Sequence, residues 1–89
     1  MSQWTVYMLE CNDGSYYTGI TTDTVRRLDE HNNNNLGAKY TRARRPVKLV
    51  YEMACENRSD ASKLEYKIRK LDRNSKLKLM KGIITIQQY

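Results

Sequence analysis

Five polar side chains, far apart along the chain, have types that together suit chemistry on a phosphate. Tyr7 and Tyr17 stand ten positions apart, Arg27 and His31 stand four apart, and Glu65 comes much later. Arginine grips phosphate oxygens through a planar fork of donors, and histidine exchanges protons near neutral pH. A single carboxylate can hold one Mg²⁺, which fills its other positions with water and phosphate oxygens. Each type also has an ordinary structural use, so their value depends on whether the fold brings them together.

The two tyrosines belong to a predicted β-hairpin. Residues 4–10 and 16–21 are rich in aromatic and β-branched types, and the turn between them contains Asp13-Gly14. If opposing positions sum to about 24, Tyr7 and Tyr17 lie directly opposite each other on one face of the hairpin. Aromatic packing across the strands explains such a pair equally well. 

Gly19 lies inside the second strand of this hairpin, where glycine is unusual. It predicts a bulge or a close approach of another group to the backbone.

A helix over about 23–33 is predicted to carry the arginine and the histidine. Its N-cap comes from the Thr22-Asp23-Thr24 segment, and a run of asparagines ends it. Arg27 and His31 then share one helix face, which is either a functional face or simply a solvated one.

Residues 36–46 form a predicted loop with a high positive charge, closed by Pro46. Its cations suit the sugar–phosphate backbone of a nucleic acid, and Tyr40 suits stacking on an exposed base. The alternative is a solvated loop that only aids solubility. The cations are Lys39, Arg42, Arg44 and Arg45.

A third strand is predicted over 47–53, followed by a helix over 59–71 that Ser59 or Asp60 caps. Four alternating residues of the strand are expected to share one face; they are Val47, Leu49, Tyr51 and Met53.

Glu65 is expected beside the apolar stripe of the 59–71 helix, at the edge of the core. Its structural alternatives are a capping box with Ser62 or an ion pair with Arg69, four positions on.

A shorter helix restarts at Asn74 or Ser75 and ends at Gly82, and residues 83–86 form an edge strand or a tail. The order strand, strand, helix, strand, helix, helix predicts an α+β fold with helices flanking a three-stranded antiparallel sheet.

Length and composition limit the classes of protein. Eighty-nine residues predict one domain, spanning 1–89 with a core over about 4–80. The net charge of +6 points to a polyanionic partner, and the mean hydropathy is −0.82. No stretch approaches the ~20 apolar residues of a membrane span, and no secretory signal begins the chain. The two cysteines, Cys11 and Cys55, are expected to be reduced thiols in a cytoplasmic protein.

These residues, taken as a spaced set, resemble the GIY-YIG nuclease superfamily. Thr5-Val6-Tyr7 and Tyr17-Thr18-Gly19 resemble the paired motifs that name it, and the later Arg27, His31 and Glu65 also match. The resemblance covers roughly residues 4–80 and is closest to small stand-alone bacterial members. Threonine replaces the glycine of the first motif and the aliphatic centre of the second. No additional DNA-binding domain, on which nucleases of the family usually rely, is evident.

The resemblance implies hydrolysis of phosphodiester bonds by water. Arg27 would neutralise the charge that builds on the phosphate, and Glu65 would hold a single Mg²⁺ or Mn²⁺. Tyr7 would be the base, provided that Arg27 and the metal lower its pKa from about 10. Tyr17 would orient water or phosphate. His31 would relay a proton or contact the phosphate.

Two further residues have roles that the same resemblance implies. Gly19 would let backbone and substrate approach closely, and Tyr40 would contribute another polar ring at the site.

We therefore expect a Mg²⁺-dependent endonuclease that acts on DNA rather than RNA, with branched or distorted structures as substrates. Two alternatives remain: a nucleic-acid-binding module without useful turnover, and a domain to which a protein partner supplies specificity. The protein is expected to be a monomer.

Overall fold

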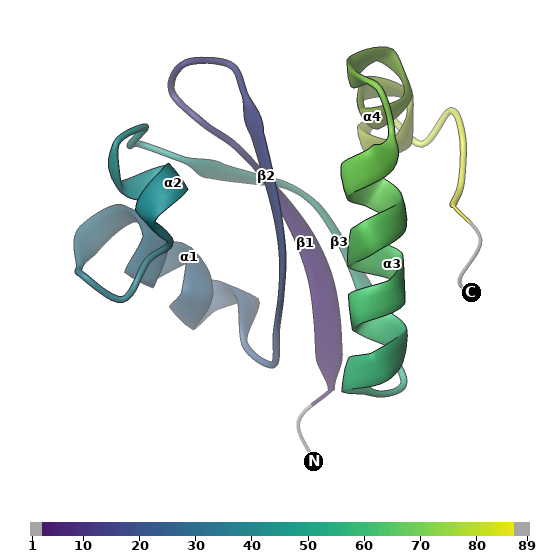
Figure 1. Ribbon diagram of the computed structural model, residues 1–89, viewed down its shortest axis with the longest axis horizontal. Coiled ribbons are helices and arrows are strands. Elements are labelled where there is room, and N and C mark those ends of the chain that lie inside the picture. Colours follow the sequence, from purple (N-terminus) through teal and green to yellow (C-terminus); the bar gives the residue numbers. More distant parts are fainter. Residues whose placement is uncertain (1–2, 87–89) are drawn as a thin grey trace.

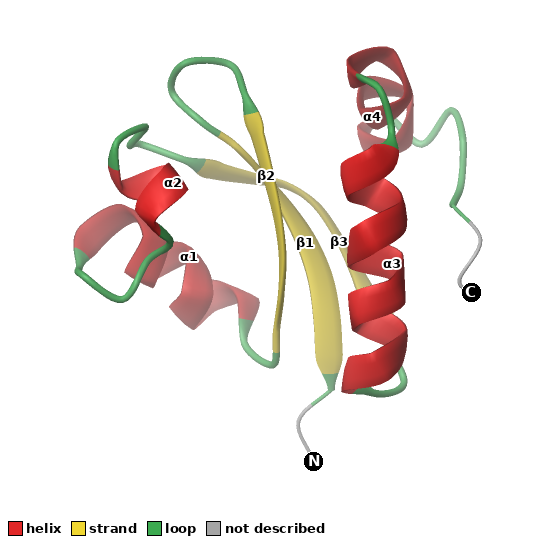
Figure 2. Ribbon diagram, viewed as in Figure 1, coloured by secondary structure: helices red, strands yellow, loops and turns green. Residues whose placement is uncertain are grey.

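The computed structural model describes residues 3–86, which form a three-stranded sheet with helices on both sides (Figures 1 and 2). The order of strands and helices agrees with the expectation except for one additional short helix in the basic loop. The elements are β1 (Trp4–Glu10), β2 (Tyr16–Thr21), α1 (Thr24–Asn33), α2 (Lys39–Arg42), β3 (Lys48–Cys55), α3 (Arg58–Lys70) and α4 (Arg73–Met80).

The sheet is antiparallel with the order β2-β1-β3, so β1 is its central strand. The hairpin register differs from the prediction by two residues. Tyr7 lies opposite Gly19, and Tyr17 lies opposite Leu9, so opposing positions sum to 26. The five-residue turn Cys11–Ser15 sets this register. Because a shift by two keeps side chains on the same face, Tyr7 and Tyr17 still share a face, as diagonal neighbours.

The pairing of β3 with β1 contains an irregularity that the alternation did not predict. Met8 pairs with Tyr51 and Leu9 pairs with Leu49, so β3 has one extra residue there. Such a bulge reverses the facing of the residues beyond it. Leu49 consequently packs in one apolar cluster, and Tyr51 packs in the other. The expectation that alternate residues of 47–53 share one face was wrong.

Two apolar clusters lie on opposite faces of the sheet. Alternation along β1 sends Val6 and Met8 toward α3, and Tyr7 and Leu9 toward α1. In Figure 1, α1 and α2 lie on one side of the sheet and α3 and α4 on the other. The two free cysteines are buried in different clusters, one on each face; they are Cys11 and Cys55.

The helix ends follow from side-chain caps. Asp23 caps α1 as expected, with its carboxylate accepting from the backbone N–H of Arg26. The cap of α3 is Asn57, and not Ser59 or Asp60, so α3 begins earlier than predicted. This early start leaves no capping box for Glu65, which lies two turns inside the helix.

The segment after α4 takes the form of a tail and not of a strand. Gly82 has a φ of +75°, in the left-handed region that glycine favours after a helix. Ile84 and Ile86 then pack against the cluster beneath α3. Residues 87–89, which belong to the same predicted tail, lie outside the described residues. Within residues 3–86, no helix is both long and apolar enough to cross a membrane.

Candidate active site

The closest contact among the five candidate residues joins Tyr7 and His31. The Tyr7 hydroxyl lies 2.8 Å from Nε2 of His31, and their rings are 5.9 Å apart. β1 supplies the tyrosine and α1 supplies the histidine, so the contact exists only because α1 packs on this face of the sheet. The Tyr17 ring makes an edge-to-face contact with the same imidazole, with a centroid distance of 5.2 Å.

His31 is fully buried, with 0% of its surface exposed. Its Nδ1 lies 2.7 Å from the hydroxyl of Thr41, so both ring nitrogens have a partner. Burial lowers the pKa of His31 to about 4, and the positive charges of Arg27 and Arg45 act in the same direction. The imidazole is therefore neutral at pH 7. Two roles were expected for His31, a proton relay or a contact with phosphate; the buried ring fits the first and leaves no exposed surface for the second.

Tyr7 is almost as deeply buried, with 2% exposed. Burial raises the pKa of Tyr7 to about 12, although a hydrogen bond with the Arg27 guanidinium acts to lower it. Arg27 acts to lower the pKa of Tyr7, as expected, but the opposing effect of desolvation is larger. At neutral pH the resting side chain is a phenol.

Arg27 lies beside Tyr7 and is held by its own helix. Its Nη1 donates to the Glu30 carboxylate at 2.8 Å and to the backbone carbonyl of Leu36 at 2.7 Å. About a quarter of the side chain is exposed, 25%, so it can meet a ligand from solvent. Glu30 sits three positions later on α1 and fixes the guanidinium against the phenol.

Tyr17 is half-buried and belongs to a row of rings. It stacks on Tyr40 at a centroid distance of 6.1 Å and an angle of 23°. The Arg44 guanidinium carbon lies 3.8 Å from the centre of the Tyr40 ring. Arg44 therefore covers one face of the Tyr40 ring. A nucleic-acid base could stack on that face only by displacing Arg44. Tyr40 is connected to the candidate site by its stacking on Tyr17.

Gly19 makes room for Tyr7. A Cβ atom at Gly19 would lie 2.6 Å from the Tyr7 hydroxyl oxygen and 2.8 Å from Cζ. The predicted close approach to the backbone exists, but the group that approaches is the phenol and not a substrate.

The four cations of the basic segment fall into two pairs. Arg44 forms an ion pair with Asp13, with 3.0 Å between Nε and Oδ2. Arg45 donates to the backbone carbonyls of Glu30, His31 and Asn34. 

These two arginines therefore join α1, α2 and the hairpin turn, and their expected contact with a nucleic acid stays a prediction. Lys39 and Arg42 are exposed on α2 and keep the predicted placement.

Glu65 lies on α3, which packs on the opposite side of the sheet from α1 (Figure 1). Its negative charge is close enough to contribute to the raised pKa of Tyr7. Burial raises the pKa of Glu65 itself, and Arg69 acts to lower it through an ion pair of 4.0 Å at the long limit. Within residues 3–86, no group of three or more His, Cys, Asp or Glu residues could hold a metal ion. Glu65 could thus bind a cation only together with water and ligand oxygens.

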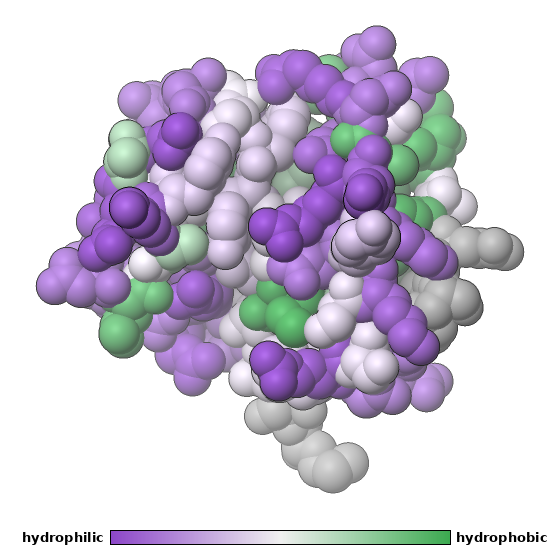
Figure 3. Space-filling model, in the orientation of Figure 1, coloured by the Kyte–Doolittle hydropathy of each residue, from purple (hydrophilic) through white to green (hydrophobic). Residues whose placement is uncertain are grey.

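A hollow of about 250 Å³ lies along β2, between α2 on one side and α3 and α4 on the other. In Figure 3 a pale band of side chains of intermediate hydropathy occupies the middle of this face, between hydrophilic margins. Three tyrosines and two cations line it. Its lining residues are Tyr16, Tyr17, Thr18, Tyr40, Arg69 and Lys76.

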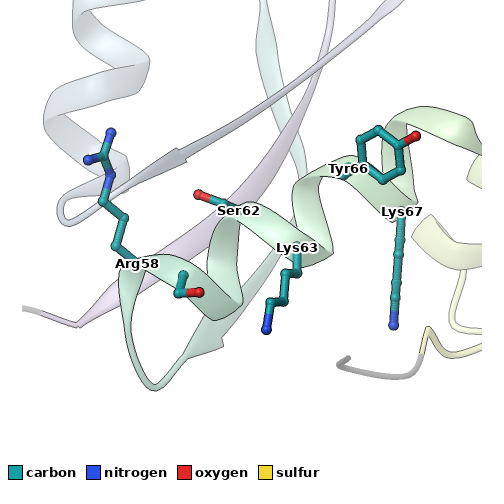
Figure 4. A pocket seen from close by; sticks show the side chains of 6 residues that line it. Arg58, Ser62, Lys63, Tyr66 and Lys67 are labelled. Atoms are coloured by element: carbon teal, nitrogen blue, oxygen red, sulfur yellow. The ribbon is translucent and has the colours of Figure 1, made fainter.

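A larger hollow, of about 740 Å³, lies on α3 (Figure 4). Its lining includes Arg58, Lys63 and Tyr66, and Tyr66 is 62% exposed. None of the five candidate residues lines it, so it is separate from the cluster around Tyr7.

Several side chains at the site were not predicted from the sequence, and three of them have a clear place in it. Thr41 supports His31, Glu30 holds Arg27, and Lys76 reaches the β2 hollow from α4. The spacing of Glu30 from Arg27 was a usable signal, since residues three apart on a helix are neighbours. Nothing in the local pattern around Thr41 or Lys76 distinguishes them from surface residues.

Comparison with known proteins identifies the family of this chain. The model of the GIY-YIG catalytic domain matches residues 3–78. A UPF0213 protein of Desulfotalea psychrophila is 54% identical over 79 residues, covering 89% of this chain and 72% of the relative. A UPF0213 protein of Staphylococcus saprophyticus is 46% identical over 80 residues, covering 90% and 96%.

Two solved structures are also similar. The solution NMR structure of protein EF2693 from E. faecalis has a TM-score of 0.63 at 40% identity, covering 100% of this chain and 96% of that one. The solution NMR structure of the UPF0213 protein BH0048 from Bacillus halodurans has a TM-score of 0.56 at 44% identity, covering 91% and 84%. This chain therefore belongs to the GIY-YIG family, whose catalytic domain is of the nuclease type.

Proposed function

We propose that this protein is a Mg²⁺-dependent endonuclease that hydrolyses phosphodiester bonds in DNA. The observation that carries the proposal is the contact of Tyr7 with both His31 and Arg27, beside the groove along β2. A proton acceptor and a phosphate-binding cation thus meet on one side of the sheet. The net charge of +6 supports a polyanionic substrate.

Arg27 binds the scissile phosphate and offsets the negative charge that develops on its non-bridging oxygens. Glu30 leaves the guanidinium oriented but partly exposed, which suits this task. Tyr17 borders both His31 and the β2 groove, and it orients the attacking water or the phosphate. Tyr7 takes the proton of that water. Because its resting form is a phenol, it must release its own proton at the same time, and neutral His31 is the acceptor at hand.

Glu65 is the residue that would hold Mg²⁺ or Mn²⁺. Its half-buried carboxylate has a raised pKa and only a long ion pair, which is a setting that a divalent cation would relieve. When bound, the ion supplies Lewis-acid polarisation of a phosphate oxygen and of the leaving oxygen.

A second function, nucleic-acid binding without turnover, is favoured by one observation. Tyr7 is 2% exposed with a pKa of about 12, so the resting site has no ready base. In this alternative the groove along β2 binds the nucleic acid, and the cluster of Tyr7 and His31 only supports the fold.

The test is a cleavage assay on linear, nicked and branched DNA with Mg²⁺, Mn²⁺ or EDTA. Glu65→Gln and Arg27→Ala should each lower the cleavage rate by about a hundredfold or more. Two matched controls should cleave at the wild-type rate: Glu56→Gln, an exposed carboxylate before α3, and Arg26→Ala, on the outer side of α1.

Equal residual cleavage in all five proteins would indicate a contaminating nuclease and refute the proposal. Binding of DNA by the wild type without cleavage in either metal would establish the alternative.

A further inference from the structure

Thr41 is a fully buried hydroxyl residue in contact with the imidazole, and neither the fold nor the proposed chemistry so far explains it. It lies on the short helix α2, and its Oγ1 is 2.7 Å from Nδ1 of His31. The same oxygen donates to the backbone carbonyl of Ala38 at 2.9 Å. A threonine hydroxyl has only one proton. If Ala38 receives that proton, Thr41 must accept the proton of Nδ1.

The opposite side of the ring leads to the same assignment. The Tyr7 hydroxyl is 2.8 Å from Nε2, and its other neighbour is the Arg27 guanidinium, which can only donate. The phenol oxygen therefore accepts from Arg27, and its own proton goes to Nε2. Nε2 is then the acceptor and Nδ1 carries the proton of the neutral ring.

A second group, the backbone N–H of Ala38, competes with Thr41 for Nδ1 of His31. The backbone N–H of Ala38 points at Nδ1 from 3.4 Å, and this weak contact favours an unprotonated Nδ1. The Thr41 contact, at 2.7 Å, is much shorter and favours the protonated one. Removing the Thr41 hydroxyl would leave two contacts that favour opposite tautomers: Tyr7 at Nε2 and the weak Ala38 N–H contact at Nδ1.

We propose that Thr41 is a positioning residue that fixes the Nδ1–H tautomer of His31 and so keeps the Nε2 lone pair directed at Tyr7. The consequence for cleavage rests on the proposed function. The attacking water gives a proton to the Tyr7 oxygen as the Tyr7 proton passes to Nε2, which leaves an imidazolium whose Nδ1–H still bonds to Thr41. With the other tautomer, Nε2–H would face the phenol and could not accept that proton.

His31 is the single histidine of the chain, so its ring nitrogens can be observed without overlap. The experiment is long-range ¹H–¹⁵N correlation NMR of uniformly labelled protein at neutral pH, which distinguishes protonated from unprotonated ring nitrogens. Wild type should show a protonated Nδ1 and an unprotonated Nε2. Thr41→Val should shift the ring toward the form with a protonated Nε2, and Thr41→Ser should retain the wild-type pattern. Thr21→Val is the matched control and should match wild type, because Thr21 is a buried threonine whose hydroxyl bonds to Asp23 and not to His31.

A protonated Nε2 in the wild type would overturn the proposal, and so would an unchanged tautomer in Thr41→Val. If that variant does not fold, Thr41→Ala replaces it, and the wild-type spectrum already tests the assignment. In the cleavage assay Thr41→Val should lose about a hundredfold or more in rate and Thr41→Ser should restore most of it. If no protein cleaves while the tautomers behave as expected, the proposed function fails and the role of Thr41 in fixing the tautomer stands.

Discussion

Gly19 lies directly opposite Tyr7 across the β1–β2 pair, and the phenol occupies the space where any other residue would place its side chain. The two residues therefore form one structural unit. Glycine in a strand interior weakens the strand, and here that loss is compensated by burial of the ring that the proposed chemistry needs.

Replacing Gly19 by alanine should destabilise the protein by about 1–3 kcal/mol, because the added methyl group overpacks the site. The strain should depend on the tyrosine ring, since the nearest atoms to the new Cβ are those of Tyr7. We therefore expect Gly19→Ala to cost much less in a Tyr7→Leu background. Urea unfolding of the two single variants, the double variant and wild type measures this coupling. Additive free energies would show that the clash lies elsewhere.

Arg45 and Arg42 have the same charge and lie three positions apart, but they should respond differently to removal. Arg45 donates to three backbone carbonyls near the end of α1, so Arg45→Ala should destabilise the protein by about 1–3 kcal/mol. Arg42 is exposed, and Arg42→Ala should change stability by less than about 0.5 kcal/mol. Thermal or urea unfolding of both variants measures the difference. Equal losses of stability would contradict the structural role of Arg45.

The sequence predicted the order of strands and helices because each depends on local signals. The hairpin turn, the Asp23 cap and the apolar stripe of α3 are all contained within a few residues. The hairpin register and the bulge in β3 were missed, since they depend on which residues face each other across the sheet. A shift of two residues in the register leaves the local pattern of a strand unchanged.

The candidate site was predicted in its membership but less well in its environment. Tyr7, Arg27 and His31 do meet, as the family resemblance implied. Their burial could not be predicted, because it comes from α2 and the arginines that follow it. Thr41 closes the site from a segment that was expected to be only a charged loop.

The groove along β2 predicts which cations contact nucleic acid first. Arg69 and Lys76 line it, whereas Lys78 and Lys81 are exposed but do not. Both pairs lose two charges when changed to glutamine, so general electrostatic attraction falls equally. We expect Arg69→Gln with Lys76→Gln to weaken DNA binding and to reduce the slope of log Kd against log salt by about 1–2. The pair Lys78→Gln with Lys81→Gln should change that slope less. Equal effects would place the contact outside the groove.

Acid should destabilise this protein through His31 over a defined range of pH. Burial lowers the pKa of His31 from 6.5 to about 4, so between these values the unfolded chain binds a proton that the folded protein does not. The stability contributed by the neutral ring is therefore complete above about pH 6.5, and it is lost as the pH falls toward 4. The loss reaches about 3 kcal/mol, because one pKa unit corresponds to about 1.4 kcal/mol.

Glu65 has a raised pKa, so its contribution to the pH dependence of stability has the opposite sign. The wild type is therefore compared with a His31→Gln variant, which retains every other titrating group. Urea unfolding at intervals from pH 7 to pH 4 should show a steeper decline for the wild type than for this variant. An NMR titration of the single histidine gives an independent value. A folded-state pKa near 6.5 would mean that the imidazole is open to solvent, and the buried contact with Tyr7 would not exist in solution.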